Sequence, residues 1–471
     1  MIHQYKNNGY NIVMDVESGS IHVVDDMVYD MIGVLDEYSR TDTVAEHIDE
    51  DTVKAAPFEK VRDLLIKKMP GYGEEDLLEA YEEVASLIED ESLFTDDPYE
   101  EQIGQLMDRE NVVKALCLHV AHDCNLSCRY CFAGEGEYHG PRGLMSLETG
   151  KQALDFLVAA SGGRKNLEVD FFGGEPLMNF EVVKELVRYG RSLEEKHDKR
   201  FRFTLTTNGI LLNDEVLEFA NREMSNLVLS IDGRKSVHDL MRPRRGGQGS
   251  YDEIVPKFQK AAASRDQTDY YVRGTFTHNN LDFSKDVIHL ADLGFEQISV
   301  EPVVAGPDED YAIKEEDIPQ ILEEYDILAK YLLERKKAGR GVNFFHFMID
   351  LTGGPCAVKR LSGCGSGTEY LAVAPNGDLY PCHQFVGMDG FLMGNVRDGV
   401  INTKLRDSFK SCNVYSREEC RKCFAKLYCS GGCAANAYNF SGSINGVYEM
   451  GCALQRKRVE CAIMLKAALS E

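Results

Sequence analysis

Cys124-Asn-Leu-Ser-Cys128-Arg-Tyr-Cys131-Phe132-Ala133 is the stretch of sequence that decides the fold. It follows an apolar run, residues 115–120, that is typical of a buried strand. A four-iron cluster is normally held by four cysteine thiolates. Because this loop offers only three, it would leave one iron open to a ligand from outside the protein.

Two other interpretations of the three cysteines are open. A zinc site is one, although zinc motifs favour paired C-x2-C units and this triplet has no fourth cysteine nearby. A redox-active C-x-x-C pair, Cys128 and Cys131, is the other, but it would leave Cys124 without a role.

The C-x3-C-x2-C spacing, with Tyr130 before the last cysteine and Phe132 after it, resembles the signature of radical S-adenosylmethionine (SAM) enzymes. The resemblance implies that the open iron chelates the amino and carboxylate groups of SAM. It also implies that one electron splits SAM into methionine and a 5′-deoxyadenosyl radical, which abstracts a hydrogen atom from the substrate. On this resemblance Cys124, Cys128 and Cys131 serve catalysis, and Tyr130 and Phe132 adjoin the cofactor.

The composition restricts the partners and the compartment. A formal charge of −26 over 471 residues argues against nucleic acid, which needs a basic surface, and disfavours an anionic membrane. No apolar run is long enough to span a bilayer, and the N-terminus lacks the features of a signal peptide. Fourteen cysteines in such a chain indicate metal rather than disulfides. We therefore expect a cytoplasmic protein, with no nucleic acid and no membrane among its partners.

Residues 1–95 are predicted to form a separate unit. Two short β-prone runs, 10–16 and 20–24, are joined by a hairpin signal and followed by helical patterns near 27–38, 57–68 and 74–90. The order resembles the winged-helix domain that recognises the leader of ribosomally made peptides, in which the leader adds a strand to the sheet edge. A structural cap or a DNA reader is the alternative.

Residues 105–305 are predicted to form a partial (β/α)6 barrel, which is the fold that the radical SAM resemblance implies. Strands expected near 115–121, 167–172, 202–206, 227–231, 271–277 and 297–301 alternate with amphipathic helices such as 147–160 and 179–193. Such alternation favours a parallel sheet with right-handed crossovers, whose ligands gather at the carboxyl ends of the strands. Residues 306–350 are predicted to bridge to a further domain at 351–471.

Several strand ends carry polar motifs that resemble SAM-binding positions of the family. Gly173-Gly174-Glu175-Pro176 resembles the GGEP motif, whose glutamate holds the SAM amino group. Arg242 matches an arginine that pairs with the SAM carboxylate. The resemblance adds four further cofactor-binding residues, namely Thr206, Asn208, Ser230 and Asp232. A turn or helix-cap role is the alternative for each of these polar residues.

The C-terminal cysteines follow the order of the SPASM domain, an extension of radical SAM enzymes that holds two auxiliary [4Fe–4S] clusters. Reduction potentials of such clusters span roughly −700 to +450 mV, so they can relay electrons or bind substrate sulfur. The resemblance assigns Cys420, Cys423, Cys429 and Cys452 to an outer cluster, and Cys364, Cys382 and Cys433 to an inner one. Cys356 is a candidate fourth inner ligand; the alternative is an open iron that a peptide thiol occupies. A zinc ribbon would explain only residues 420–433.

Cys117, Cys412 and Cys461 stand outside these patterns and are predicted to be buried small apolar residues. With the N-terminal hairpin, the stretches 363–370 and 381–385 make the whole chain resemble the maturases of SCIFF peptides. That family forms thioether (sactionine) links between a cysteine sulfur and a carbon of another residue. The resemblance implies SAM, three [4Fe–4S] clusters, a cysteine-rich precursor peptide with a leader, and an external one-electron reductant. Alternatives are a maturase that forms carbon–carbon links or formylglycine, and a non-catalytic iron–sulfur electron carrier.

Overall fold

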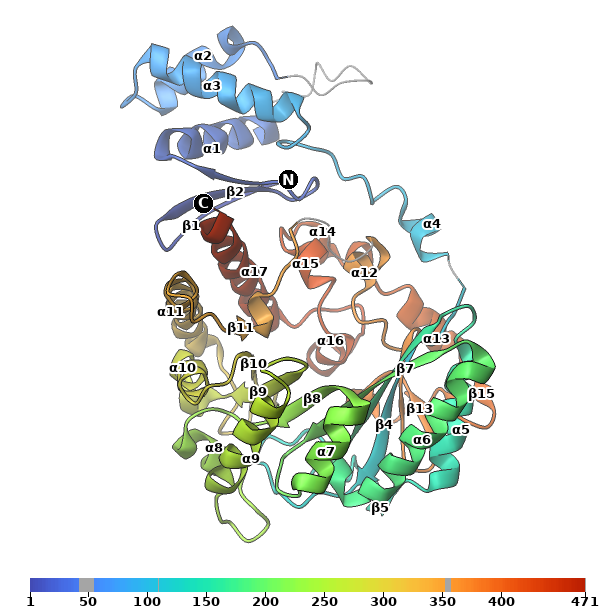
Figure 1. The fold of residues 1–471 in the computed structure, drawn as a ribbon. Helices are drawn as coiled ribbons and strands as arrows, with labels where there is room; N and C mark the ends of the chain where they lie inside the picture. The colour runs from blue at the N-terminus through green and yellow to red at the C-terminus, as the bar shows by residue number, and fades with distance from the viewer. Residues whose placement is uncertain (42–54, 109, 352–356, 471) are drawn as a thin grey trace.

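The computed structural model describes residues 1–41, 55–108, 110–351 and 357–470. The chain begins with a three-stranded antiparallel sheet of order β1-β2-β3, in which β3 is an edge strand. Three helices follow the sheet and cover one of its faces (Figure 1). The elements of this unit are β1 (Ile2–Asn7), β2 (Tyr10–Asp15), β3 (Ile21–Val24), α1 (Asp26–Thr41), α2 (Phe58–Lys68) and α3 (Glu74–Glu89). The hairpin and the three helices were predicted, whereas β1 was not.

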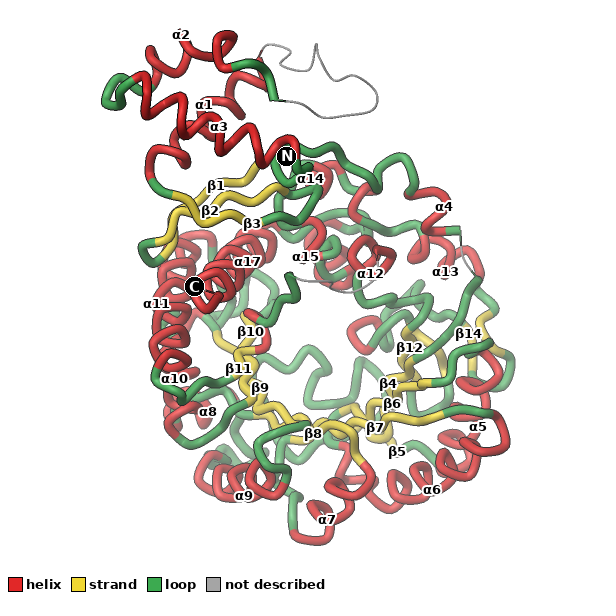
Figure 2. The backbone as a smooth tube through the Cα atoms, turned by 45° about the horizontal axis from the view of Figure 1, so that its top comes forward, coloured by secondary structure: helices red, strands yellow, loops and turns green. Residues whose placement is uncertain are grey.

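The N-terminal sheet is apolar on both faces, because alternate side chains of a strand point to opposite sides. Ile2 and Val13 pack among the apolar side chains of α1, α2 and α3. Ile12 and Met14, by contrast, belong to the main core of the molecule. The C-terminal helix α17 (Glu449–Ser470) contacts this second face (Figures 1 and 2). The helices of this unit therefore form a core of their own, whereas the second face of its sheet packs against the rest of the protein.

The predicted barrel strands are confirmed as six parallel neighbours that form a curved sheet (Figure 2). They are β4 (Ala115–His122), β6 (Asn166–Gly173), β7 (Arg200–Thr207), β8 (Met224–Ser230), β9 (Tyr270–Phe276) and β10 (Gln297–Pro302). Helices on the outer side connect them, namely α5 (Leu147–Ala160), α6 (Phe180–His197), α7 (Asp214–Glu223), α8 (Lys235–Met241), α9 (Tyr251–Ser264) and α10 (Ser284–Asp292).

The sheet continues beyond the barrel at both ends. β12 (Tyr370–Val373) pairs with β4 in parallel, and β11 (Asn343–Phe344) pairs with β10. The C-terminal region therefore shares a sheet with the barrel. The remaining strands are β5 (Gly143–Leu144), which pairs with β4, and the antiparallel series β13 (Asp378–Tyr380), β14 (Gly394–Asn395) and β15 (Gly399–Val400).

The C-terminal region is built from short helices and loops around its cysteines. Two long helices, α11 (Ile318–Lys337) and α17, contact each other beside the barrel (Figure 1). The shorter helices are α4 (Ile103–Met107), α12 (Ala357–Ser362), α13 (Thr403–Lys410), α14 (Glu418–Arg421), α15 (Lys426–Cys429) and α16 (Ala434–Ser441). Among the described residues, no helix has the length and apolar character that crossing a bilayer requires.

Candidate radical and iron–sulfur site

The loop of Cys124, Cys128 and Cys131 follows the carboxyl end of β4 and is held by backbone hydrogen bonds. The N–H groups of Ser127 and Arg129 donate to the carbonyls of Pro243 and Met241, at 2.9 Å each. The loop is therefore fixed against the segment that carries Arg242.

The three thiols of this loop lie close enough to influence one another's ionisation. Burial, then the charge of Glu175, raises the pKa of Cys124 to about 11, and Cys131 adds to the rise. Burial is also the main cause that raises the pKa of Cys128 to about 12, with contributions from Cys124 and Cys131. A metal must therefore displace a proton from each of these two thiols when it binds.

Gly173 and Gly174 allow the strand end of β6 to pack directly against the backbone that leads into the cysteine loop. A Cβ atom on Gly174 would lie 2.2 Å from the carbonyl oxygen of Asp123, and one on Gly173 would lie 2.2 Å from that of Ala121. The N–H groups of Gly174 and Glu175 donate to these same two carbonyls at 2.8 and 2.9 Å. Any side chain at either glycine would push the motif away from the cysteines.

Glu175 is fully buried and is bound by its surroundings on both carboxylate oxygens. It accepts hydrogen bonds from the Thr207 hydroxyl (2.8 Å), the Asn208 N–H (2.8 Å) and the Leu177 N–H (3.0 Å). Burial nevertheless raises its pKa to about 7. A carboxylate has about four acceptor positions, so a fourth donor such as an ammonium group can still bind here.

Asn208 connects Glu175 to the cysteine loop. Its side-chain Nδ2 donates to Asn125 Oδ1 at 2.7 Å and lies 3.6 Å from the Cys124 sulfur, while its backbone N–H binds Glu175. In this structure Asn208 therefore acts on the loop and on Glu175.

Asp232 and Arg242 form a buried ion pair beside the same loop. Arg242 Nε donates to Asp232 Oδ1 at 3.0 Å, and the Tyr130 hydroxyl lies 2.7 Å from both oxygens of Asp232. The Arg242 guanidinium also stacks 5.3 Å from the centroid of the Tyr130 ring. These three predicted residues thus form one cluster, in which Asp232 orients Arg242.

Thr206 and Ser230 lie on strands whose alternate side chains face the inside of the barrel. Thr206 shares its face of β7 with Arg202 and Thr204, which line a cavity of about 480 Å³ together with Tyr271 of β9. Thr207, on the opposite face, is the residue that binds Glu175. Thr206 was predicted and Thr207 was not, because the motif does not show which of the two threonines faces Glu175.

The four cysteines assigned to the outer cluster line one cavity of about 210 Å³, namely Cys420, Cys423, Cys429 and Cys452. Burial is the main cause that raises the pKa of Cys429 to about 12, and the charges of the other three contribute. All four thiols therefore face a common space, as a shared cluster requires.

The cysteines assigned to the inner cluster form a second group. The pKa of Cys382 is raised to about 12, first by burial and then by Cys433 and Cys364. Cys364 also contributes to the raised pKa of Cys433, after burial. Cys356 lies outside the described residues.

His383, which follows Cys382, brings the inner group next to the first cysteine loop. Its ring centroid lies 5.6 Å from that of Phe132 and 5.2 Å from that of Phe172. Phe132 directly follows Cys131. His383 was not predicted from the sequence. The one signal for it is its position directly after the predicted ligand Cys382.

A charged group formed by Arg273 in the middle of β9, Glu301 near the end of β10 and His346 was also not predicted. Arg273 donates to Glu301 at 2.8 Å, and His346 Nε2 lies 3.8 Å from the same carboxylate. The negative charge of Glu301 contributes to the raised pKa of Cys433. Polar groups of the barrel therefore extend to the inner cysteines, and His346, from the segment predicted only as a bridge, belongs to this charged group.

Cys117, Cys412 and Cys461 are buried, as predicted, but Cys412 and Cys461 also have polar side-chain partners, Arg417 and Asp326 respectively. All thirteen described cysteines are free thiols. In the part of the chain that the structure describes, no three His, Cys, Asp or Glu side chains are arranged around a single metal ion.

Comparisons with protein families match two parts of the chain. Residues 118–272 match the radical SAM superfamily. Residues 364–424 match SPASM, an iron–sulfur cluster-binding domain. The first match contains the Cys124 loop, the glycine motif and Arg242, and the second contains Cys364, Cys382, Cys420 and Cys423.

Three proteins illustrate what the chain is similar to. A cysteine-type anaerobic sulfatase-maturating enzyme of Clostridium perfringens is 24% identical over 333 residues, which are 66% of this chain and 85% of the relative. The structure of anSMEcpe with bound AdoMet and the Kp18Cys peptide has a TM-score of 0.62 at 20% identity, covering 76% of this chain and 99% of that one. Streptococcus suis SuiB bound to its precursor peptide SuiA has a TM-score of 0.51 at 14% identity, covering 94% and 97%.

Proposed function

We propose that this protein, in which a radical SAM domain is joined to a C-terminal SPASM domain, forms thioether cross-links in a ribosomally made, cysteine-rich precursor peptide. SAM and [4Fe–4S] clusters are its cofactors. When bound, they supply one-electron chemistry and a hydrogen-abstracting radical derived from SAM.

The observation that carries the proposal is the closeness of the two cysteine loops. His383, next to Cys382, lies 5.6 Å from the ring of Phe132, next to Cys131. A thioether requires that a carbon and a sulfur of the peptide meet at the moment when the carbon has lost its hydrogen. Two cysteine loops that border the same space can hold these two groups together, whereas distant loops could not.

The atoms and electrons of the proposed reaction balance. The carbon loses a hydrogen atom to the 5′-deoxyadenosyl radical, and the thiol loses a proton to solvent or to a base. When the carbon–sulfur bond forms, one electron is left over, and it replaces the electron that was used to split SAM. An external one-electron reductant is therefore needed to start the reaction and to replace lost electrons.

We assign three roles to residues of this chain. Cys124, Cys128 and Cys131 would hold the cluster that binds SAM. Glu175 would accept a hydrogen bond from the SAM amino group, and the Asp232–Arg242 pair would present its guanidinium to the SAM carboxylate.

The N-terminal unit is the proposed site for the leader of the peptide. β3 is one of the two edge strands of its sheet, and an edge strand offers unpaired backbone groups with which an extended peptide can pair. The formal charge of −26 suits a neutral or basic peptide. SuiB, whose structure with a precursor peptide resembles 94% of this chain, supports a peptide as the substrate class.

A maturase that oxidises a cysteine or links two carbons is the second candidate, because the chain is similar to a sulfatase-maturating enzyme. Incubation of the reconstituted protein with SAM, dithionite and a cysteine-containing peptide tests the enzyme class. We expect peptide-dependent formation of 5′-deoxyadenosine, and deuterium transfer into it when the carbon-bound hydrogens of the peptide are deuterated. Absence of both would indicate an electron carrier rather than an enzyme.

A further inference from the structure

Arg417 is a buried arginine of the C-terminal region. Its side chain is 3% exposed and directly precedes α14, which carries Cys420. Its Nη2 donates to the carbonyl of Ile444 at 2.6 Å and to the Cys412 sulfur at 2.9 Å, and its Nη1 donates to the carbonyl of Gly431. Nε has no hydrogen-bond partner, and Arg417 forms no ion pair among the described residues.

A comparison with Lys426 shows that the lack of an ion pair at Arg417 is unusual for a buried cation. Lys426 is equally buried, but it forms ion pairs with Glu17 at 3.0 Å and with Asp97 at 2.7 Å. Burying a charge without a partner is costly, since the lost hydration is not replaced. An anion bound nearby in the protein with its cofactors would balance the charge of Arg417.

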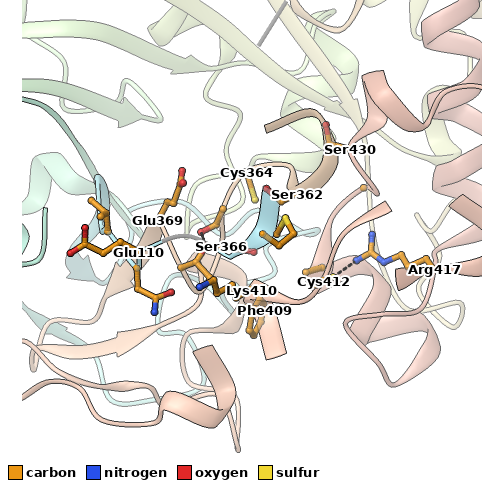
Figure 3. A pocket seen from close by; sticks show the side chains of 17 residues that line it. Glu110, Ser362, Cys364, Ser366, Glu369, Phe409, Lys410, Cys412, Arg417 and Ser430 are labelled. Carbon is orange, nitrogen blue, oxygen red and sulfur yellow. Dashed lines mark hydrogen bonds between the residues drawn. The ribbon is translucent and has the colours of Figure 1, made fainter. Parts of the chain in front are cut away.

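The surroundings of Arg417 are the two auxiliary cysteine groups. Arg417 directly precedes α14, which carries Cys420 of the outer group, and its Nη1 donates to the carbonyl of Gly431, which lines the cavity of the four outer cysteines. On its other side, Arg417 and Cys412 line the same pocket as Cys364 of the inner group (Figure 3). Arg417 thus lies between the outer group and Cys364 of the inner group.

Arg417 also fixes the segment that joins the two groups. Gly431, whose carbonyl it binds, lies between Cys429 of the outer group and Cys433 of the inner group. A Cβ atom on Gly431 would lie 2.5 Å from Arg417 Nη1, so the glycine allows the guanidinium to approach this closely. The arginine therefore contacts the connection between the groups as well as the cysteines.

A [4Fe–4S] cluster held by four thiolates is anionic in both of its common oxidation states and gains a further negative charge on reduction. A fixed cation beside it stabilises the reduced form more than the oxidised form, especially where water is excluded. The cavity of the outer group fits such a cluster, because four cysteines line it.

We propose that Arg417 is the electrostatic partner of the outer auxiliary cluster and raises its reduction potential, so that this cluster readily accepts an electron passed outward from the inner one. Arg417 is a positioning residue, not a catalytic one. The proposal rests on the iron–sulfur clusters alone. A failure of the thioether chemistry would therefore not overturn it.

The test is an EPR-monitored redox titration of the full-length reconstituted protein, with iron content measured on the same samples. In Arg417→Met we expect one auxiliary midpoint potential to become more negative while the others change little. Arg417→Lys, which keeps the charge, should restore part of that shift.

Arg421→Met is the matched control. Arg421 lies on α14 next to Cys420, but its side chain is half exposed and pairs with Glu100. Solvent screens such a charge, so its loss should leave every midpoint unchanged. Unchanged midpoints in Arg417→Met with full iron content would overturn the proposal, as would an equal shift in Arg421→Met. If Arg417→Met does not retain iron, Arg417→Gln is titrated in its place, because it removes the charge and keeps a hydrogen-bond donor. One auxiliary midpoint potential that is more negative at full iron content supports the proposal, and unchanged midpoint potentials overturn it.

Discussion

Glu175 has a pKa of about 7 in a site where its proposed partner is a cation. Burial raises this pKa, so the protonated acid stabilises the fold below the unfolded value near 4.5, and that stabilisation is lost as the pH rises through 7. An ammonium group binds more strongly to the ionised form of Glu175 than to its protonated form. Binding of SAM should therefore weaken as the pH falls below 7, by up to about tenfold per pH unit.

Calorimetric titration of the reconstituted protein with SAM from pH 6 to 8 measures this effect. Glu175→Gln is the control, because it removes the titrating group and keeps a similar shape. It should bind SAM more weakly and lose this part of the pH dependence. An identical pH dependence in both proteins would show that Glu175 does not contact the amino group.

Cys128 provides a second prediction at the scale of one residue. Cys128→Ala should remove one cluster and abolish SAM cleavage, while iron falls from about twelve to about eight atoms per chain, at four per cluster. Cys117→Ala is a suitable control, since Cys117 is buried on β4 outside the three cysteine groups. Retained SAM cleavage in Cys128→Ala would contradict the assignment of the triplet.

Single residues were predictable where chemistry fixes the residue type and the spacing. The cysteines that the resemblance assigns to the outer group line one cavity, and Tyr130, Asp232 and Arg242 meet in one cluster, whereas the assignment of ligands to each iron–sulfur cluster stays a prediction. His383 and Arg417 were not predictable, because their roles depend on contacts between segments far apart in the chain.

The N-terminal sheet yields a prediction at the scale of an element. Val23 is 42% exposed on the edge strand β3. Val23→Asp should weaken binding of the leader by about tenfold, or about 1.4 kcal/mol, because it places a charge on the edge that the peptide would join. Leu78→Asp on α3, where Leu78 is 39% exposed, is the control. Calorimetric titration with the leader peptide measures the affinity of both variants. Equal affinities would show that the leader binds at another part of the protein.

Lys426 holds three parts of the molecule together. It lies on α15 of the C-terminal region and pairs with Glu17, in the turn between β2 and β3, and with Asp97, in the linker. Lys426→Met would remove the nearest cation from the buried Glu17 and from the partly buried Asp97, at a cost of about 3 kcal/mol. Thermal unfolding of the purified protein should show a clearly lower midpoint than in Lys422→Met, where the lysine is 80% exposed. Equal midpoints would show that the pair contributes no net stability.

At the scale of the whole molecule, periodicity predicted the barrel strands and the larger helices, since each pattern is local. The contacts between the N-terminal unit, the barrel and the C-terminal region were not predictable. β12 extends the barrel sheet beside β4, and α17 packs under the N-terminal sheet, which makes residues 1–95 less separate than expected. Such pairings join residues hundreds of positions apart, and no local pattern encodes them.

The central claim is that this protein joins a cysteine sulfur to a carbon of the same peptide. Tandem mass spectrometry of a cysteine-rich precursor peptide, incubated with the reconstituted protein, SAM and reductant and then treated with a thiol-alkylating reagent, tests it most directly. We expect the loss of two hydrogen atoms per link, one unalkylated sulfur per link and one 5′-deoxyadenosine per link. A product in which every cysteine is still alkylated, despite the formation of 5′-deoxyadenosine, would contradict it.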